Sequence, residues 1–455
     1  MNHRPHGIVL FLVTGAIACL ALPAVAGSCA AAEAPPFIRV PDTLSGDNPP
    51  YPLPDLKPPK PGQPFTDARF GTSLMQVTQQ KGMRHEYARH DPFNVNQSMI
   101  LLRSPQEGNW LVYRTKTIPY DTQGNLVRQL DVEEPRWDPA DPDLLWATRE
   151  FQILTVNFKS ADPGVVKDFA KDPALAPLIK AEPDLYRVTM KDEGEASADK
   201  RYWAFILQGS KDDYRPRYIF TWDRTADKVL GVLKLAADQA DIDWVGMSPL
   251  GTYVLIGGGD QTPGKLAGLT MADKPLTTFQ RIDYATAHAD VGLDSDGREV
   301  IVMQNTRTDY IDLIPLDLKT RPILEASGSY EGTNHTRLVR LFYDSESPRG
   351  LASGVHISCN TPGWCVVSTY IRPDEKEKNW LDRSIVLVKL DPRKPQAWYL
   401  AKVHNTTAEY WEETHASITA DGSKVVWACN WGQDVGKEKA CLIQLDMPKA
   451  WKRLK

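Results

Sequence analysis

TADGSKVVWA, at residues 419–428, is the clearest copy of a turn-and-strand pattern that decides the fold of this chain. A polar turn leads into a run of β-branched and aromatic residues that is typical of a strand. Six further copies precede it: NVNQSMILL at 94–102, DPADPDLLW at 138–146, ASADKRYWAF at 196–205, MSPLGTYVLI at 247–256, LDSDGREVIV at 293–302 and NTPGWCVVS at 360–368. Seven copies indicate a repeat protein rather than a sandwich or a barrel.

The spacing of the copies fits one four-stranded blade per repeat. Their turn positions lie 45 to 66 residues apart, at Gln97, Pro142, Lys200, Gly251, Gly297, Gly363 and Gly422. The sequence therefore predicts an all-β fold, a seven-bladed β-propeller over residues 65–455. One helix-prone stretch, 163–180, is expected to be an insertion on a loop.

Two segments precede the predicted propeller. Arg4, an apolar run from Ile8 to Leu22 and AVA at 24–26 are typical of a secretory signal peptide, which we assign to residues 1–26. We therefore expect a secreted or periplasmic protein with no membrane span. Residues 27–64 are rich in proline, which favours an extended leader or arm over a helix.

The net charge argues against one class of function, and the cysteines predict disulfides. The formal net charge of the chain is -5, so no global basic field indicates nucleic-acid binding. Export permits disulfides. We expect two hairpin bridges, Cys359–Cys365 and Cys429–Cys441, with a metal-ligand role for Cys359 as the alternative.

Four histidines share one phase of the repeat. His90, His356 and His415 each lie seven residues before a turn position, and His288 lies nine before one. In a propeller this phase is the start of the innermost strand, so we expect these imidazoles to converge at one end of the channel. Neutral imidazoles bind divalent metals, with zinc favoured here and manganese or calcium as alternatives. A polar channel lining that binds water is the competing interpretation.

The segment RHEYARHDPFN, at 84–94, gathers many ionisable residues before the first repeat strand. In extended backbone alternate residues share a face. That divides the segment into two sets: His85, Tyr87 and Arg89 against Glu86 and His90. The first set offers a base, an acid and an anion clamp. A solvated, charged strand entry is the alternative.

Blade 3 offers a weaker candidate. RYWAFILQGSKDDYRPRYIF places Tyr202 on one strand and Arg215 and Arg217 on the next, where they could hold a carboxylate. Packing is the alternative role for such aromatic residues.

The TADGSKVVWA stretch resembles the TolB-like propeller repeat. Together with HEYAR and the histidines of the late blades, it makes residues 65–450 resemble the seven-bladed polysaccharide lyases, namely oligogalacturonate and ulvan lyases. The resemblance implies β-elimination on an acidic, uronate-containing polysaccharide or oligosaccharide. It also implies residue roles: His85 or His90 as base, Tyr202 as acid, Arg217 as carboxylate clamp, Arg84, Tyr87, Arg89, Arg136 and Trp244 as substrate contacts, and His288, His356, His415 and Cys359 around a metal.

One departure keeps a second hypothesis open. The ulvan lyase pattern implies a further His in the stretch SPQEGNWLVYR, which has none. A non-catalytic TolB-like propeller that binds sugar or protein is therefore the alternative function. No G-x-S-x-G nucleophile elbow supports a hydrolase, and no repeated Trp docking motif supports a quinone-dependent dehydrogenase.

Overall fold

The computed structural model describes residues 36–45, 48–104, 109–160, 163–210, 213–237, 241–258, 266, 268–284, 288–306, 308–319, 335–341 and 354–454. Residues from Pro36 onward form one compact unit. The predicted signal peptide, at 1–26, lies outside the described residues. No helix among the described residues is long and apolar enough to cross a membrane.

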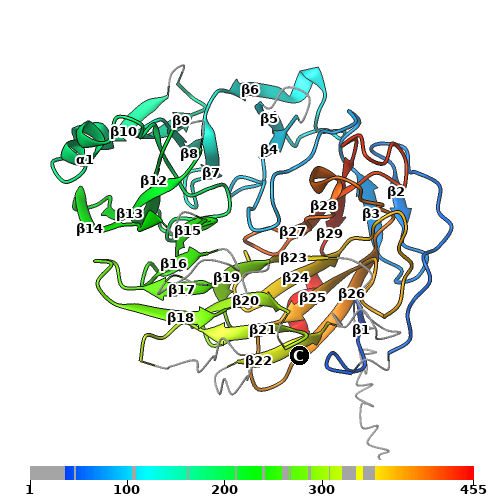
Figure 1. Ribbon diagram of the computed structural model, residues 1–455. Coiled ribbons are helices and arrows are strands. Elements are labelled where there is room, and N and C mark those ends of the chain that lie inside the picture. The colour runs from blue at the N-terminus through cyan, green and yellow to red at the C-terminus, as the bar shows by residue number, and fades with distance from the viewer. Residues whose placement is uncertain are drawn as a thin grey trace, which may run out of the picture. The chain divides into compact units, whose positions relative to one another are not determined.

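Seven antiparallel sheets surround a central channel, and each sheet is one blade (Figure 1). Blade 1 holds β4 (Met99–Arg103), β5 (Trp110–Arg114) and β6 (Leu126–Leu130). Blade 2 holds β7 (Glu133–Trp137), β8 (Leu144–Arg149), β9 (Gln152–Asn157) and β10 (Gly164–Asp168). Blade 3 holds β11 (Arg187–Thr189), β12 (Tyr202–Gln208), β13 (Pro216–Asp223) and β14 (Lys228–Lys234). Blade 4 holds β15 (Trp244–Met247), β16 (Val254–Gly257), β17 (Leu269–Ala272) and β18 (Phe279–Asp283).

The later blades repeat this order. Blade 5 holds β19 (Ala289–Leu293), β20 (Glu299–Asn305), β21 (Tyr310–Pro315) and β22 (Thr336–Arg340). Blade 6 holds β23 (Val355–Ser358), β24 (Trp364–Thr369), β25 (Ser384–Lys389), β26 (Gln396–Lys402) and an added edge strand, β1 (Ile38–Arg39). Blade 7 holds β27 (Ser417–Ile418), β28 (Lys424–Cys429), β29 (Cys441–Asp446), β3 (Ser73–Gln76) and β2 (Pro64–Thr66).

The predicted all-β, seven-bladed propeller is confirmed, and backbone geometry supports its register. Six of the seven turn positions predicted from the sequence have positive φ, between 54° and 81°: Gln97, Lys200, Gly251, Gly297, Gly363 and Gly422. A tight turn from the innermost strand to the next requires this left-handed conformation, which glycine adopts without strain. Pro142 is the exception because its ring fixes φ at a negative value.

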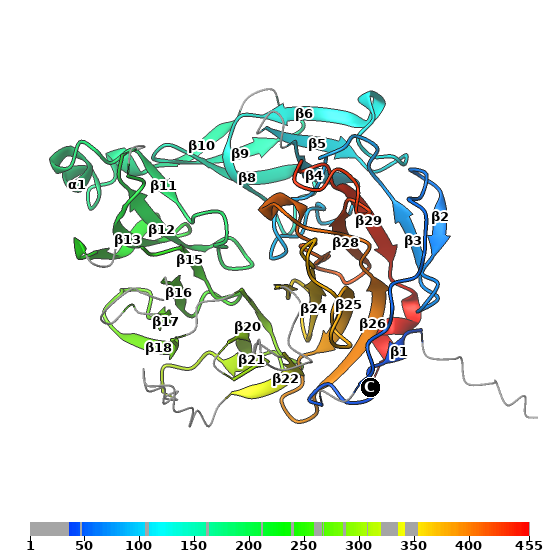
Figure 2. The same cartoon turned by 45° about the vertical axis from the view of Figure 1, so that its right-hand side comes forward.

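The ring closes with strands from both ends of the described chain. β3 pairs with β29, the third strand of blade 7, and β2 pairs with β3 (Figure 2). Part of the proline-rich arm also joins the propeller, because β1 pairs with β26 in blade 6.

The prediction that residues 163–180 form a helical insertion is wrong for the first residues of this stretch. Residues 164–168 form β10, the outer strand of blade 2, because Val165 and its neighbours pair with β9. After the short 3-10 helix η2 (Phe169–Lys171), only α1 (Ala176–Ala181) is α-helical. Other 3-10 helices that lie fully within the described residues include η1 (Gln123–Asn125), η5 (Tyr410–Glu412) and η6 (Lys449–Arg453).

Blade 1 differs from the others at the channel. In place of an innermost strand it has two single bridges, Arg84 with Arg103 and Phe93 with Ile100. The chain between these bridges leaves the sheet and enters the channel. We call residues 84–91 the channel segment.

Candidate active site

The channel segment is buried along its length rather than solvated. Arg84, His85, Glu86, Arg89 and His90 expose 6% or less of their surface. The alternative interpretation of a solvated, charged strand entry is therefore wrong. So many buried ionisable side chains need specific partners, since an unpaired buried charge is costly.

Three of the predicted histidines meet at one end of the channel. The ring centroids of His288 and His356 lie 4.3 Å apart, and those of His356 and His415 lie 3.9 Å apart. Each residue stands at the start of the innermost strand of its blade: before β19, in β23 and before β27. We call these three residues the histidine cluster. The fourth histidine of the repeat phase, His90, contacts other groups.

A carboxylate that the sequence analysis missed completes this cluster. Glu413 hydrogen-bonds to Nε2 of His356 and lies 3.3 Å from Nε2 of His415. His356, Glu413 and His415 have ligand atoms within 4.8 Å of one another, a spacing that suits one metal ion. The only signal in the sequence was proximity, because Glu413 is two residues before His415.

Burial keeps the imidazoles of the cluster neutral, which is the form that binds a metal. Desolvation lowers the pKa of His288 to about 3 and that of His356 well below its ordinary value, so both rings are neutral at pH 7. Burial also raises the pKa of Glu413 to about 7. Nδ1 of His356 is buried and has no hydrogen-bond partner among the described residues. Neutral imidazoles and a carboxylate fit a divalent transition metal.

Three residues of the channel segment hold the histidines in place. Arg84 donates to Nδ1 of His415 at 2.8 Å, and the Tyr87 hydroxyl lies 2.8 Å from Nδ1 of His288. The Tyr87 ring also packs against His356 and His415. His85 hydrogen-bonds through Nε2 to the backbone oxygen of His415.

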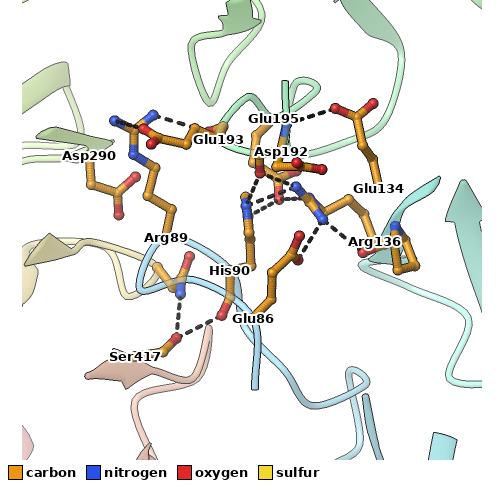
Figure 3. Close-up of polar contacts among 12 residues, drawn as sticks. Glu86, Arg89, His90, Glu134, Arg136, Asp192, Glu193, Glu195, Asp290 and Ser417 are labelled. Carbon is orange, nitrogen blue, oxygen red and sulfur yellow. Dashed lines mark hydrogen bonds and ion pairs between the residues drawn. The ribbon is translucent and has the colours of Figure 1, made fainter. Parts of the chain in front are cut away.

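Glu86 and His90 of the channel segment join a second network, around Arg136 (Figure 3). Arg136 donates to Glu86 at 2.9 Å and lies 3.0 Å from a carboxylate oxygen of Glu195. His90 contacts Arg136 at 2.8 Å and Glu195 at 2.9 Å. Burial, with the charge of Arg136, lowers the pKa of His90 to about 4.

Arg89 also faces away from the histidine cluster, on the same side as the Arg136 network. It pairs with Glu193 at 3.0 Å, and its guanidinium lies 4.4 Å from the ring centre of Trp244. The expected division of the segment therefore holds for four residues: His85 and Tyr87 face the histidine cluster, and Glu86 and His90 face Arg136. Arg89 departs from it because residues 84–91 are not a regular strand.

The structure does not bring Tyr202 and Arg217 to either group, which corrects their expected place in one site with the histidines. Tyr202 pairs with Asp223 in the β12–β13 register, whereas Arg217 lies beside the far end of β12. The two residues therefore lie at opposite ends of one hairpin. Tyr202 has the ammonium of Lys274 over its ring, and Arg217 is bound by Asp184 and Asp213.

The metal-ligand role expected for Cys359 is also wrong. Cys359 is bonded to Cys365 across the β23–β24 turn, so no thiolate remains to bind a metal. The expected bridge between Cys359 and Cys365 is thus confirmed. The second expected bridge is wrong: Cys429 and Cys441 face each other across β28 and β29, but both thiols are free and buried.

Comparisons with known proteins show which solved structures share this fold. No protein-family model matches this chain, and no curated protein matches its sequence. An oligogalacturonate lyase in complex with manganese matches with a TM-score of 0.55 and 12% identity, over 86% of this chain and 97% of that chain. An oligogalacturonate lyase from Vibrio parahaemolyticus matches with a TM-score of 0.54, 12% identity and the same coverage.

The chain is therefore a seven-bladed β-propeller, as its sheets show. More particularly, its fold is the one that these oligogalacturonate lyases have. At 12% identity the similarity establishes the fold, so the activity has to be argued from the site.

Proposed function

We propose that this protein is an exported polysaccharide lyase that cleaves uronate-containing polysaccharide or oligosaccharide by β-elimination. One observation carries the proposal. His288, His356, His415 and Glu413 gather at one end of the channel in the fold of a lyase whose structure contains manganese.

His356, His415 and Glu413 would hold the metal, with His288 beside them. When bound, a divalent ion offsets the negative charge that develops on a uronate carboxylate. Two or three imidazole ligands favour zinc or manganese over calcium, which prefers oxygen ligands. Arg84 donates to Nδ1 of His415, so the proton of this neutral ring is on Nε2. For Nε2 to bind a metal, that proton would have to move to Nδ1, and the hydrogen bond from Arg84 would then be lost.

The reaction needs a base near the carbon that bears the carboxylate. In β-elimination the base removes the proton at C5, the C–H electrons form the C4–C5 double bond, and the C4–O bond breaks. The departing oxygen then takes up a proton. Among this chain's residues, the Tyr87–His288 pair offers both groups: His288 is neutral at pH 7 and can take up a proton, and Tyr87, whose pKa burial raises well above its ordinary value, can donate one to the departing oxygen.

This assignment replaces the earlier candidates for the base. His85 is fully buried, and desolvation lowers its pKa to about 3, so it orients His415 rather than meeting a substrate. His90 faces the Arg136 network instead.

Cations and aromatic groups near the histidine cluster fit an acidic sugar. Arg372 is exposed and close enough to affect the charge of Glu413. Tyr410 is 42% exposed, and its ring centre lies 5.1 Å from that of His415. An exposed ring and an exposed cation near the same cluster suit a pyranose that carries a carboxylate.

A substrate panel tests the proposal. The purified protein, supplied in turn with zinc, manganese and calcium, would be mixed with oligogalacturonate, ulvan, alginate and glucuronan fragments. Ultraviolet absorbance would report the conjugated product. We expect metal-dependent cleavage of at least one substrate, loss of that cleavage with a chelator and in Glu413→Gln, and retention in the exposed control Glu150→Gln. Binding of an oligosaccharide without any cleavage would instead support the non-catalytic propeller.

A further inference from the structure

A cavity of about 330 Å³ occupies the channel on the other side of the channel segment from the histidine cluster. It is lined by residues at or just after the ends of innermost strands, among them Met247, Leu293 and Asn360. The histidine cluster lies at the starts of such strands. On blades 5 and 6, therefore, the cavity lies at the ends of the strands whose starts carry His288 and His356. We call this space the strand-end cavity.

The walls of the strand-end cavity are mostly apolar. They include Phe93, Trp137, Trp244 and Met247. The side chains of Glu193 and Glu195 are 24% and 34% exposed, more than their partners in the buried network. An apolar cavity of this size with a few polar groups is the usual form of a small-molecule site.

The cations that line the cavity already have partners. Lys200 and Arg136 each lie 3.0 Å from an oxygen of Glu195, and Arg89 lies 3.0 Å from Glu193. No other Lys or Arg lines the cavity among the described residues. An anionic ligand would therefore compete with Glu193 or Glu195 for each cation, which disfavours a uronate here.

Carboxylates are in excess over these cations. Three are paired with them, and three more belong to aspartates that accept backbone N–H groups: Asp91, Asp138 and Asp290. Burial raises the pKa of Asp91 and Asp290 to about 7, and a positively charged ligand would favour their ionised form. The carboxylates also have lone pairs that accept further hydrogen bonds. The aromatic walls add faces that attract an organic cation.

We propose that the strand-end cavity binds a small organic cation, an ammonium group on an apolar body, with the head at Glu193 and Glu195 and the body against the apolar walls. This site is separate from the proposed lyase site. It takes the opposite charge and requires no metal.

A matched ligand series tests the proposal on the whole protein. The three probes are 2-phenylethylammonium, 2-phenylethanol and 3-phenylpropionate, which share a phenyl body and differ in the charge of the head. Calorimetric titration should show binding of the ammonium, with the alcohol and the carboxylate at least about tenfold weaker, the difference that a charge-assisted hydrogen bond makes. Absence of ammonium binding, or equal binding of all three probes, would overturn the proposal.

Variants locate the site. Glu195→Gln and Glu193→Gln should each weaken binding of the ammonium about tenfold, whereas Glu150→Gln should leave it unchanged. Glu195 also holds Arg136, His90 and Lys200, so thermal unfolding of each variant would be measured first. If Glu195→Gln fails to fold, Glu193→Gln and the ligand series decide the result. Ammonium binding should also persist in a chelator, which separates it from the lyase proposal. Unchanged affinity in folded Glu193→Gln and Glu195→Gln would place the ligand elsewhere and refute the assignment.

Discussion

The Tyr87 hydroxyl lies 2.8 Å from Nδ1 of His288, although 201 residues separate them in the sequence. The contact forms because the channel segment crosses from blade 1 to the start of the innermost strand of blade 5. It places a phenol and an imidazole next to the candidate metal ligands.

Removing this phenol oxygen tests its proposed role. Tyr87→Phe should lower kcat about one hundredfold or more on whichever substrate is cleaved, because positioned proton transfer contributes at least that factor. KM and metal content should change little, since Tyr87 is not one of the ligands. Steady-state kinetics would check this, with Tyr214→Phe, on an exposed loop of blade 3, as the control. Full activity of Tyr87→Phe would exclude the phenol as the proton carrier.

Glu413 should be the residue on which metal binding depends most clearly. Glu413→Gln keeps the shape of the side chain but loses the charge, so zinc or manganese affinity should fall at least about tenfold. Titration calorimetry with each metal would measure the change. Arg136→Lys is the control, because Arg136 lies in the second network and not among the proposed ligands. The metal affinity of this variant should equal that of the wild type. Equal affinity in Glu413→Gln would rule out the proposed ligand set.

Glu86 should make stability depend on pH. Burial, despite Arg136 nearby, raises the pKa of Glu86 to about 8 from an ordinary value of 4.5. Between these values the folded chain binds a proton that the unfolded chain releases, so this residue's contribution to stability is lost as pH rises. The free energy of unfolding of Glu86→Gln, relative to wild type, should therefore increase from pH 4.5 to 8, by up to about 1.4 kcal/mol per pH unit.

Urea unfolding of both proteins at several pH values would check the sign. A difference between them that is constant over this range would mean that Glu86 is ionised in the fold throughout.

The four cysteines of the propeller should behave as two different pairs. Burial raises the pKa of Cys429 to about 12 and that of Cys441 to about 11, so both thiols should resist alkylation in the folded protein. Cys359 and Cys365 should react only after reduction. Peptide mapping after iodoacetamide treatment, with and without denaturant and reductant, would distinguish the pairs. Labelling of Cys429 in the native protein would contradict the burial of this thiol.

Much of the fold was predictable because it repeats. Seven turns carry a local signal, and the phase that they fix brought His288, His356 and His415 to one place. The repeat pattern does not predict contacts where the chain departs from the blade structure. The channel segment is not a strand, so its contacts with Arg136 and Glu195 were not accessible from periodicity.

The errors in blade 3 have a different cause. Tyr202 and Arg217 are on neighbouring strands, but strand register decides which residues face each other, and the sequence alone does not fix the register of a long hairpin. Cys359 was ambiguous for a chemical reason, because a thiol serves equally as a metal ligand and as half of a disulfide.

The pairing of β3 with β29 also constrains the order in which the molecule is made. A ribosome makes residues 73–76 before blades 1 to 6 and residues 441–446 after them, so β3 waits for its partner while those blades are made. The earlier blades can form in turn, but blade 7 cannot be completed until β29 has been made. A chain terminated before β29 should therefore stay open and susceptible to proteases, however many finished blades it contains.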